Sequence, residues 1–485
     1  MQMRSVSRLV GGQWRMPEPG HGIEVSDPAD LRRVIATVPS MTGPEVTELY
    51  DEATKGAAAW AATPVPERAA VLAAAAAGLR EAGDEIATDL VAEMGKTRAE
   101  AEGEVAKAAD FLDYYASFGR RPYGELIPDA RRGVATSVRF EPVGIVCLIT
   151  PWNDPLLTPA RKLSPALIAG NAVILKPATQ TPLVALHLAR VLDRAGLPAG
   201  VLGVAVGQTG EISDALLDDE RLAALSFTGS TAVGRSLQRR LAGRPVRVQT
   251  EMGGKNASVV LADADVDLAV STIGAAAFGQ AGQRCTATSR VILDRTVAGK
   301  VLDGLVGYAK AVRLGPGSDR DTTMGPLVSE QQRAEVLGHI DRARADGAEV
   351  LAGGAAPAGE PFAHGCFVEP TVLSGVGPAM AIWREEVFGP VVAVRVVDGF
   401  DAAVEAANDS CYGLAASVFT ESLRHAHAFA DRAQAGQVSV NLPTTGWDVH
   451  MPFGGFGDSG SAFKEQGTEG LRFYTRVKTV AVRHV

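Results

Sequence analysis

The chain has 485 residues, 46% of them hydrophobic, and is long enough to fold as two or three domains with separate cores. Its formal net charge of −9 argues against a general nucleic-acid-binding protein, which needs a clustered surplus of lysine and arginine to neutralise phosphates. We therefore expect a soluble globular protein without a nucleic-acid partner.

The N-terminus and the cysteines indicate a cytoplasmic protein. Residues 1–12 contain no apolar core followed by a small-residue cleavage site, and no stretch of the chain approaches about 18 uninterrupted apolar residues. Cys147, Cys285, Cys366 and Cys411 are widely spaced and form no CxxC pair. This spacing predicts reduced thiols, with no disulfide framework and no metal site. The short apolar runs predict that the chain has no membrane segment.

Helices dominate the first part of the chain. Residues 43–62 and 66–118 are rich in Ala, Glu, Leu and Arg, with apolar positions at helical spacing, and predict two or three long helices. From residue 143 onwards, short apolar runs alternate with helical segments. The expected strands are 144–150, 171–175, 201–206 and 222–227, and the expected helices are 156–169, 182–195 and 231–241. Strands separated by helices predict right-handed crossovers and a parallel sheet.

A second alternation begins at residue 257 and predicts a second α/β domain. Its expected strands are 257–261 and 290–293, and its expected helices are 266–278 and 301–312. Residues 123–140 and 472–482 alternate in the manner of strands and are expected to pair as a flap, whose edge suits a partner subunit. The predicted fold class is α/β, with two doubly wound parallel-sheet domains and a small β-strand oligomerisation flap.

Two sequence motifs suggest a reaction. Cys285 lies in Gly-Gln-Arg-Cys-Thr, and Glu251 opens Glu-Met-Gly-Gly-Lys-Asn. A thiol nucleophile and a carboxylate base, each set among glycines, are what is needed to form a thioester from an aldehyde and then to hydrolyse it. The alternative for Cys285 is a buried and unreactive cysteine.

Three further motifs follow predicted strands, where an open α/β sheet binds its ligands. Asn153, in Thr-Pro-Trp-Asn-Asp-Pro, is a candidate donor to a substrate oxyanion or a simple helix cap. Lys176, in Leu-Lys-Pro-Ala-Thr, either binds a ribose or phosphate or is a solvated surface charge. Residues 227–234 offer a helix N-terminus to a pyrophosphate or form a plain capped helix, because their glycines are spaced GxxxxG rather than GxGxxG.

Together these motifs resemble the NAD(P)-dependent aldehyde dehydrogenase superfamily. The resemblance runs in order over nearly the whole chain, and any one motif can arise by chance whereas seven in the right order do not. The segments that carry it are 151–153, 176–177, 227–230, 251–255, 282–285, 385–390 and 452–455.

The resemblance implies a catalytic set. Cys285 would be the nucleophile and Glu251 the base that activates the deacylating water. The amide of Asn153 and the backbone N–H of Cys285 would form the oxyanion hole. Glu465, in Phe-Lys-Glu-Gln-Gly, is similar to the carboxylate that relays protons from the base. The cofactor-binding residues implied in the same way are Trp152, Lys176, Thr179, Gly207, Phe227, Gly229, Ser230, Glu386 and Phe388.

Thr179 departs from the common family pattern. NAD-preferring members often carry a glutamate there, whose carboxylate would bind the ribose 2′-OH and repel a 2′-phosphate. Because Thr179 is neutral and Lys176 supplies a phosphate partner, the expected cofactor is NADP or NAD, with dual use allowed.

The expected substrate pocket combines cationic and aromatic residues. Arg161 and Arg284 resemble arginines of semialdehyde dehydrogenases, and two guanidinium groups would clamp a distal carboxylate. The alternative is that one or both pair with internal acids such as Asp154. Trp447 and His450 lie in a loop expected to form the far wall of the pocket, and they favour a planar or aromatic aldehyde instead.

We therefore predict NAD(P)-dependent oxidation of an aldehyde, in particular a carboxylate-bearing semialdehyde, to the acid through a thiohemiacetal and a thioester. The alternatives are an aromatic-aldehyde dehydrogenase and a CoA-acylating semialdehyde dehydrogenase, although Glu251 argues against acyl transfer to CoA. The flap would join a homodimer or homotetramer. The expected domains are an NAD(P)-binding domain of residues 1–120 and 141–250, a catalytic domain of residues 251–450, and an oligomerisation flap of residues 121–140 and 462–485.

Overall fold

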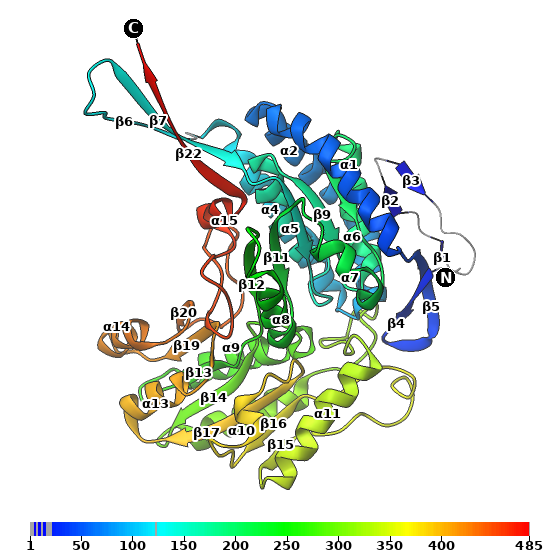
Figure 1. Ribbon diagram of the computed structural model, residues 1–485. Coiled ribbons are helices and arrows are strands. Elements are labelled where there is room, and N and C mark those ends of the chain that lie inside the picture. Colours follow the sequence, from blue (N-terminus) through cyan, green and yellow to red (C-terminus); the bar gives the residue numbers. More distant parts are fainter. Residues whose placement is uncertain (1–3, 6–7, 11–12, 16–21, 122–123, 485) are drawn as a thin grey trace.

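The computed structural model describes residues 4–5, 8–10, 13–15, 22–121 and 124–484. Two largely parallel sheets with their helices form the body, and a small antiparallel sheet projects from it together with the C-terminus (Figure 1). The predicted α/β class, with two parallel sheets and a strand flap, is confirmed. Within the part of the chain that the structure describes, no helix is both long enough and apolar enough to span a membrane.

The first sheet is parallel throughout, with strand order β10-β9-β8-β11-β12. The order reverses between β8 and β11, which is the switch point where open α/β sheets bind ligands. Its strands are β8 (Ile145–Ile149), β9 (Ala172–Lys176), β10 (Leu202–Val204), β11 (Leu222–Thr228) and β12 (Arg247–Glu251). The connecting helices are α5 (Leu157–Ala169), α6 (Pro182–Arg194), α7 (Thr209–Leu217) and α8 (Thr231–Leu241). The sequence patterns missed α7 and β12.

Both faces of this sheet are covered, because successive side chains of a strand point to opposite sides. In β8, Val146 and Leu148 enter one apolar core, whereas Ile145 and Cys147 enter another. The strand is therefore apolar at every position rather than at every second one.

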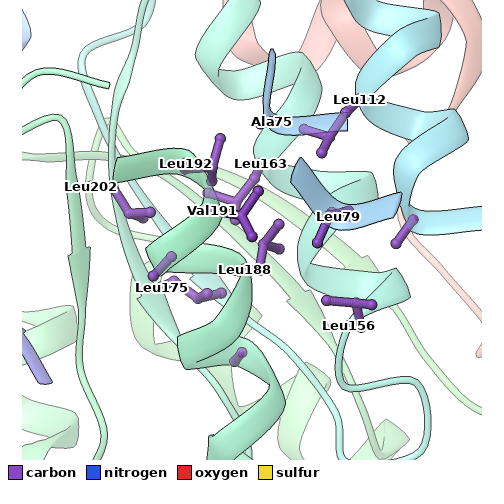
Figure 2. Packing of buried hydrophobic residues seen from close by; sticks show 14 of the residues in the cluster. Ala75, Leu79, Leu112, Leu156, Leu163, Leu175, Leu188, Val191, Leu192 and Leu202 are labelled. Carbon is purple, nitrogen blue, oxygen red and sulfur yellow. The ribbon is translucent and has the colours of Figure 1, made fainter. Parts of the chain in front are cut away.

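Figure 2 shows part of the first core. Leu175 of β9, Leu163 of α5 and Leu188 of α6 gather there with side chains of the N-terminal helices. A leucine that is fully buried in such a core stabilises the fold by about 1.5–3 kcal/mol relative to exposure.

The N-terminal helical region is divided more finely than the sequence predicts. Residues 43–116 form four helices, not two or three long ones, because the chain breaks around Ala82 and at Gly95. Gly95 has a φ of 86°, a left-handed conformation that suits glycine and ends α3, and Thr97 then caps α4 by accepting the Glu100 N–H at 3.3 Å. These helices are α1 (Gly43–Ala62), α2 (Val65–Glu81), α3 (Gly83–Met94) and α4 (Arg98–Ala116).

The second sheet has strand order β15-β16-β17-β14-β13-β19-β20 and is parallel except for its antiparallel edge strand β15. Its strands are β13 (Asn256–Val260), β14 (Thr288–Asp294), β15 (Glu349–Ala352), β16 (Thr371–Ser374), β17 (Val391–Val397), β19 (Ala415–Phe419) and β20 (Gln437–Val440). The helical segments around it are α9 (Val266–Phe278), η2 (Gly279–Gly282), α10 (Ala298–Ala311), α11 (Glu330–Ala345), α12 (Ala381–Arg384), α13 (Gly399–Asn408) and α14 (Leu423–Arg432).

The flap joins segments that are far apart in the sequence. β22 (Thr475–Arg483) pairs antiparallel with β7 (Val134–Pro142) along its whole length, and β6 (Glu125–Ile127) completes the sheet (Figure 1). The expected strand 472–482 begins too early, because residues 472–474 end helix α15 (Gly467–Tyr474). Phe473 and Tyr474 are adjacent and both buried, which a strand with one exposed face does not allow. Tyr123, where the other flap segment was expected to begin, lies outside the described residues.

Short elements complete the described chain. They are β1 (Arg4–Ser5), β2 (Arg8–Val10), β3 (Gln13–Arg15), β4 (Gly22–Asp27), β5 (Asp30–Pro39), η1 (Ser117–Arg120), β18 (Tyr412–Gly413) and β21 (Phe456–Gly457).

The packing in Figure 2 predicts the effect of removing one core leucine. Leu175→Ala leaves a cavity at a fully buried position, so it should lower the free energy of unfolding by about 2–5 kcal/mol. Leu423→Ala is the matched control, because that side chain is 78% exposed, and it should change the value by less than about 0.5 kcal/mol. Denaturant unfolding measures both, and equal effects would contradict this assignment of the core.

Candidate active site

The candidate site lies where the two large sheets meet. Parallel strands end at the same edge of a sheet, so residues that follow β8, β11 and β12 come together. Asn153 follows β8, Ser230 follows β11 and Glu251 ends β12. From the second sheet, Cys285 lies just before β14. The topology therefore gathers these four residues, which are distant in sequence, at one junction.

A cavity of about 270 Å³ opens on one side of Cys285. Trp152 and Phe388 form part of its wall, with ring centres 5.2 Å apart in an edge-to-face arrangement. Of the residues expected to bind a cofactor, those that line this cavity are Trp152, Gly229, Ser230, Glu386 and Phe388.

A second cavity of about 350 Å³ is also lined by Cys285. Arg284, Trp447 and Phe453 are among its lining residues. Asp154, Arg161 and Cys285 line both cavities. Cys285 therefore lies where the two cavities meet.

Two asparagine amides hold the loop that carries Cys285. Asn256 of β13 donates its Nδ2 to the Cys285 carbonyl at 2.8 Å and to the Ala287 carbonyl at 2.8 Å. Asn153 donates its Nδ2 to the Gln283 carbonyl at 3.0 Å. Leu156, and not Asn153, occupies the N-cap position of the helix that follows. Asn153 is therefore no helix cap. An amide has two N–H hydrogens, so this bond leaves Asn153 one for a ligand.

Burial makes the thiol of Cys285 a weak acid. It raises the pKa of Cys285 to about 12, and the positive charge of Arg161 opposes this shift. Ionisation therefore requires a group that accepts the thiol proton, or a ligand that brings positive charge close to the sulfur.

Glu251 is a buried carboxylate without a hydrogen-bond partner among the described residues, although the charges of Lys162, Lys464 and Arg161 act on it. Burial and repulsion from Glu465 raise the pKa of Glu251 well above its ordinary value. Gly454 leaves room for it, since a Cβ there would lie 2.5 Å from Glu251 Oε1. Such an acid holds a proton readily and is suited to proton transfer.

Glu465 belongs to a buried ion pair that the sequence did not reveal. Lys162 of α5 contacts Glu465 through its Nζ and also donates to Ser226 Oγ at 2.7 Å. Burial lowers the pKa of Lys162, and attraction to Glu465 opposes that shift. One signal was available, because Lys162 stands directly after Arg161 in a helix of otherwise small and apolar residues.

Of the two arginines, Arg161 contacts an internal acid, as the expected alternative allows, although that acid is Glu465 and not Asp154. Asp154 binds the buried Lys96 at 2.7 Å rather than an arginine. Arg161 lies 3.5 Å from Glu465 Oε2, donates to Thr158 Oγ1 at 3.2 Å and covers the ring of Phe453. Arg161 is therefore already partly neutralised by an internal acid.

Arg284 is different, because the side chain that binds it among the described residues, Gln280, is neutral. Its Nε donates to Gln280 Oε1 at 2.7 Å, and no salt bridge of Arg284 is found among the described residues. Trp447 shares the second cavity with it and donates its Nε1 to the Thr444 carbonyl at 3.0 Å. His450 lies outside both cavities, with an exposed ring 3.4 Å from Asp448.

The remaining cofactor candidates are not among the residues that line the first cavity. Lys176 is buried and donates its Nζ to the Pro177 carbonyl at 3.2 Å. Thr179 donates to Gln180 Oε1 at 3.3 Å. The ring of Phe227 packs against Gly229, where a Cβ would lie 2.6 Å from it, and Gly207 lies against Ile212.

The chain is similar along its length to proteins of one family. Residues 14–480 match the profile of the Aldehyde dehydrogenase family. The chain is 43% identical over 472 residues to the alpha-ketoglutarate semialdehyde dehydrogenase of Haloferax volcanii, covering 97% of this chain and 98% of that protein. It is 38% identical over 466 residues to the 2,5-dioxopentanoate dehydrogenase of Saccharolobus solfataricus, covering 95% and 96%. The structure of betaine aldehyde dehydrogenase from Staphylococcus aureus in complex with NAD+ matches with a TM-score of 0.96 at 30% identity, covering 99% of this chain and 95% of that one.

The carboxyl of Glu386 predicts a pH dependence of stability. Burial raises the pKa of Glu386 from 4.5 to about 7, although the Gly254 N–H, 2.8 Å from Oε1, opposes the shift. Between these two values the folded state keeps a proton that the unfolded chain has released, so the free energy of unfolding falls as the pH rises. Glu386→Gln should remove this contribution to the decrease in the free energy of unfolding. The decrease is measured as the difference in Tm between about pH 5 and about pH 8.

Glu85→Gln is the control for this measurement, because Glu85 is exposed on α3. It should leave the pH dependence of Tm unchanged. A Glu386→Gln protein with the same pH dependence as the unsubstituted one would show that this carboxyl is not protonated in the folded state.

Proposed function

The chain belongs to the aldehyde dehydrogenase family, whose members oxidise aldehydes to acids, and we propose that its substrate is a carboxylate-bearing semialdehyde of the α-ketoglutarate semialdehyde type. The family that the motifs indicated is thereby confirmed, and the enzyme is an NAD(P)-dependent dehydrogenase. The relatives with 43% and 38% identity are named for α-ketoglutarate semialdehyde and 2,5-dioxopentanoate, two names for the same compound.

The observation that carries the substrate proposal is the charge of the second cavity. Arg284 lines this cavity beside Cys285 and has no ion-pair partner among the described residues. An unpaired guanidinium on a cavity wall is suited to bind a carboxylate with two parallel hydrogen bonds. An aldehyde whose far end carries a carboxylate would satisfy Arg284 while its carbonyl carbon meets the thiol. Trp447 supports an aromatic aldehyde as the second candidate.

The first cavity fits a dinucleotide. Thr228 Oγ1 is buried in its wall without a partner among the described residues, and Ser230 precedes the N-terminus of α8, whose free N–H groups favour phosphate. Trp152, Ser230, Glu386 and Phe388 would hold the cofactor, and Lys176 with the neutral Thr179 is compatible with NADP as well as NAD. When bound, NAD(P) supplies the hydride acceptor that aldehyde oxidation requires.

We assign the covalent chemistry to Cys285. Its sulfur would bond to the aldehyde carbon and form a thiohemiacetal, whose oxyanion would accept the second N–H of Asn153 and the backbone N–H of Cys285. Oxidation at the same carbon gives a thioester. Glu251 would then take a proton from the water that hydrolyses this thioester, with Glu465 and Lys162 next to receive or supply protons.

We also propose the larger organisation. The first sheet with its helices would bind the cofactor, the second would carry the nucleophile, and the flap would join subunits of a homodimer or homotetramer. Exposed apolar side chains on the flap support this, since Leu126 is 86% and Val477 is 64% exposed. The four free cysteines support a reducing, cytoplasmic location.

Glu251 distinguishes hydrolysis from acyl transfer to CoA. Glu251→Gln should still release one equivalent of reduced cofactor per active site in a burst, because thioester formation does not need the water-activating base. Steady-state turnover should fall about 10²- to 10⁴-fold. Rapid-mixing absorbance measures both phases.

Two variants accompany this measurement. Cys285→Ala should abolish the burst, whereas the exposed Glu405→Gln should behave as the unsubstituted enzyme. Restoration of Glu251→Gln turnover by added CoA would contradict the hydrolytic mechanism and favour an acylating enzyme.

Arg284 tests the substrate proposal. Arg284→Gln should lower kcat/KM for α-ketoglutarate semialdehyde about 10- to 100-fold, because a charge-assisted contact with its carboxylate is lost. Hexanal, which has no carboxylate, should be affected much less, and benzaldehyde tests the aromatic alternative. Arg295→Gln, at an exposed position distant from the cavity wall, is the control. Equal losses for α-ketoglutarate semialdehyde and hexanal would refute the proposal.

A further inference from the structure

Gln280 lies in a constrained turn directly before the nucleophile. Gln280, Ala281 and Gly282 have φ values of 53°, 52° and 67°, so three successive residues adopt left-handed backbone. That conformation is unfavourable for residues with a Cβ and persists only when neighbouring contacts hold it. One such contact comes from α4, because Glu100 Oε1 accepts the Gln280 N–H at 2.6 Å.

The side chain of Gln280 is buried and its amide is fully engaged. On one side, Nε2 donates to the Asn153 carbonyl at 2.6 Å and to Asp154 Oδ1 at 3.2 Å. On the other side, Oε1 accepts from Arg284 Nε at 2.7 Å. The two acceptors on one side and the donor on the other allow this amide only one orientation.

The contact orients Arg284 without neutralising it. Arg284 uses its Nε for Gln280, so its terminal nitrogens remain available to the second cavity. An acid in place of Gln280 would hold the guanidinium equally well but would cancel the charge that attracts a substrate carboxylate. The neutral amide of Gln280 therefore orients the Arg284 guanidinium and leaves its positive charge intact.

A nearby acid does not take over this role. Asp154 lines the same cavity, but Lys96 binds its Oδ1 at 2.7 Å and Gln280 Nε2 binds the same atom. Lys96 is buried and also contacts Glu104, whose Oε1 accepts the Leu156 and Leu157 N–H groups at 2.9 Å each. Asp154 is therefore paired with a cation of its own. Against the effect of burial, attraction to Lys96 and also to Arg284 lowers the pKa of Asp154, but Asp154 and Arg284 form no salt bridge among the described residues.

We propose that Gln280 is a positioning residue that determines substrate specificity by aiming Arg284 at the distal carboxylate of the semialdehyde. This inference rests on the proposed function. Gln280 acts through Arg284 and touches neither the reacting carbon nor the sulfur. Its contribution should consequently appear in the binding of acidic aldehydes and not in the chemistry common to all aldehydes.

The decisive variant is Gln280→Glu, which has the same shape and adds a negative charge. It should lower kcat/KM for α-ketoglutarate semialdehyde relative to hexanal about 10- to 100-fold, mainly through a higher KM, because the new carboxylate neutralises Arg284. Gln280→Met keeps the size of the side chain and leaves Arg284 charged but without its hydrogen bond to residue 280. The ratio of kcat/KM for α-ketoglutarate semialdehyde to kcat/KM for hexanal should therefore fall by about 3- to 10-fold. Gln434→Glu and Gln434→Met, at an exposed position, are the matched controls and should leave the ratio unchanged.

Arg284→Gln supplies the background that isolates this effect. In that background, either Gln280 substitution should change the ratio by less than about 2-fold, because the group that Gln280 positions is gone. The Tm of each variant reports on loss of the fold. Its turnover of hexanal reports on damage to the loop that carries Cys285.

The outcomes separate this inference from the proposed function. If Gln280→Glu and Gln280→Met lower kcat for both aldehydes equally and leave the ratio unchanged, Gln280 only supports the loop and the inference is wrong. If Arg284→Gln lowers the ratio but the Gln280 variants do not, the inference fails while the carboxylate proposal stands. If Arg284→Gln itself leaves the ratio unchanged, the substrate proposal fails and the inference fails with it.

Discussion

The candidate site depends on the hydrogen bonds that two asparagine amides donate to the loop carrying Cys285. Asn153, after the end of β8, and Asn256, at the start of β13, belong to different sheets, and both donate to carbonyls of residues 283–287. Each sheet is rigid because its strands are buried on both faces. The thiol is therefore placed relative to both sheets, and hence between the two cavities.

Burial then sets the electrostatics of this junction. Cys285, Glu251 and Glu386 all have raised pKa values, each with burial as the largest cause. A buried acid without partners is unfavourable for stability, so its presence is typical of a site where proton transfer matters more than stability. Lys162 shows the opposite arrangement, since its charge is matched by Glu465 within the same core.

The second cavity differs from the first in how its charges are paired. Lys96 is matched by Asp154 and Glu104, and Arg161 is partly matched by Glu465. Arg284 is bound to a neutral amide instead. Lys107 is matched by Asp448, and the carboxylate of Glu100 is bound by the N–H groups of Thr97 and Gln280. Arg284 is thus the cation of this wall that the described residues leave without an ion pair, which suits a substrate with a single distal carboxylate.

The sequence by itself determined the alternation of strands and helices, the family and the motifs that carry the nucleophile and the base, because each depends on residues close together in the chain. It missed β12 and α7, divided residues 66–118 too coarsely, and extended the flap strand into α15, where local patterns are ambiguous. It also gave no bounds for any element between residues 313 and 471, where the structure has β15, β16, β17, β19, β20 and α11 to α14. Only the tertiary structure decided which charges meet. Lys162 reaches Glu465 across 303 positions, Asp154 pairs with Lys96, and His450 lines neither cavity. Local spacing does not encode such contacts, since packing of distant elements brings them together.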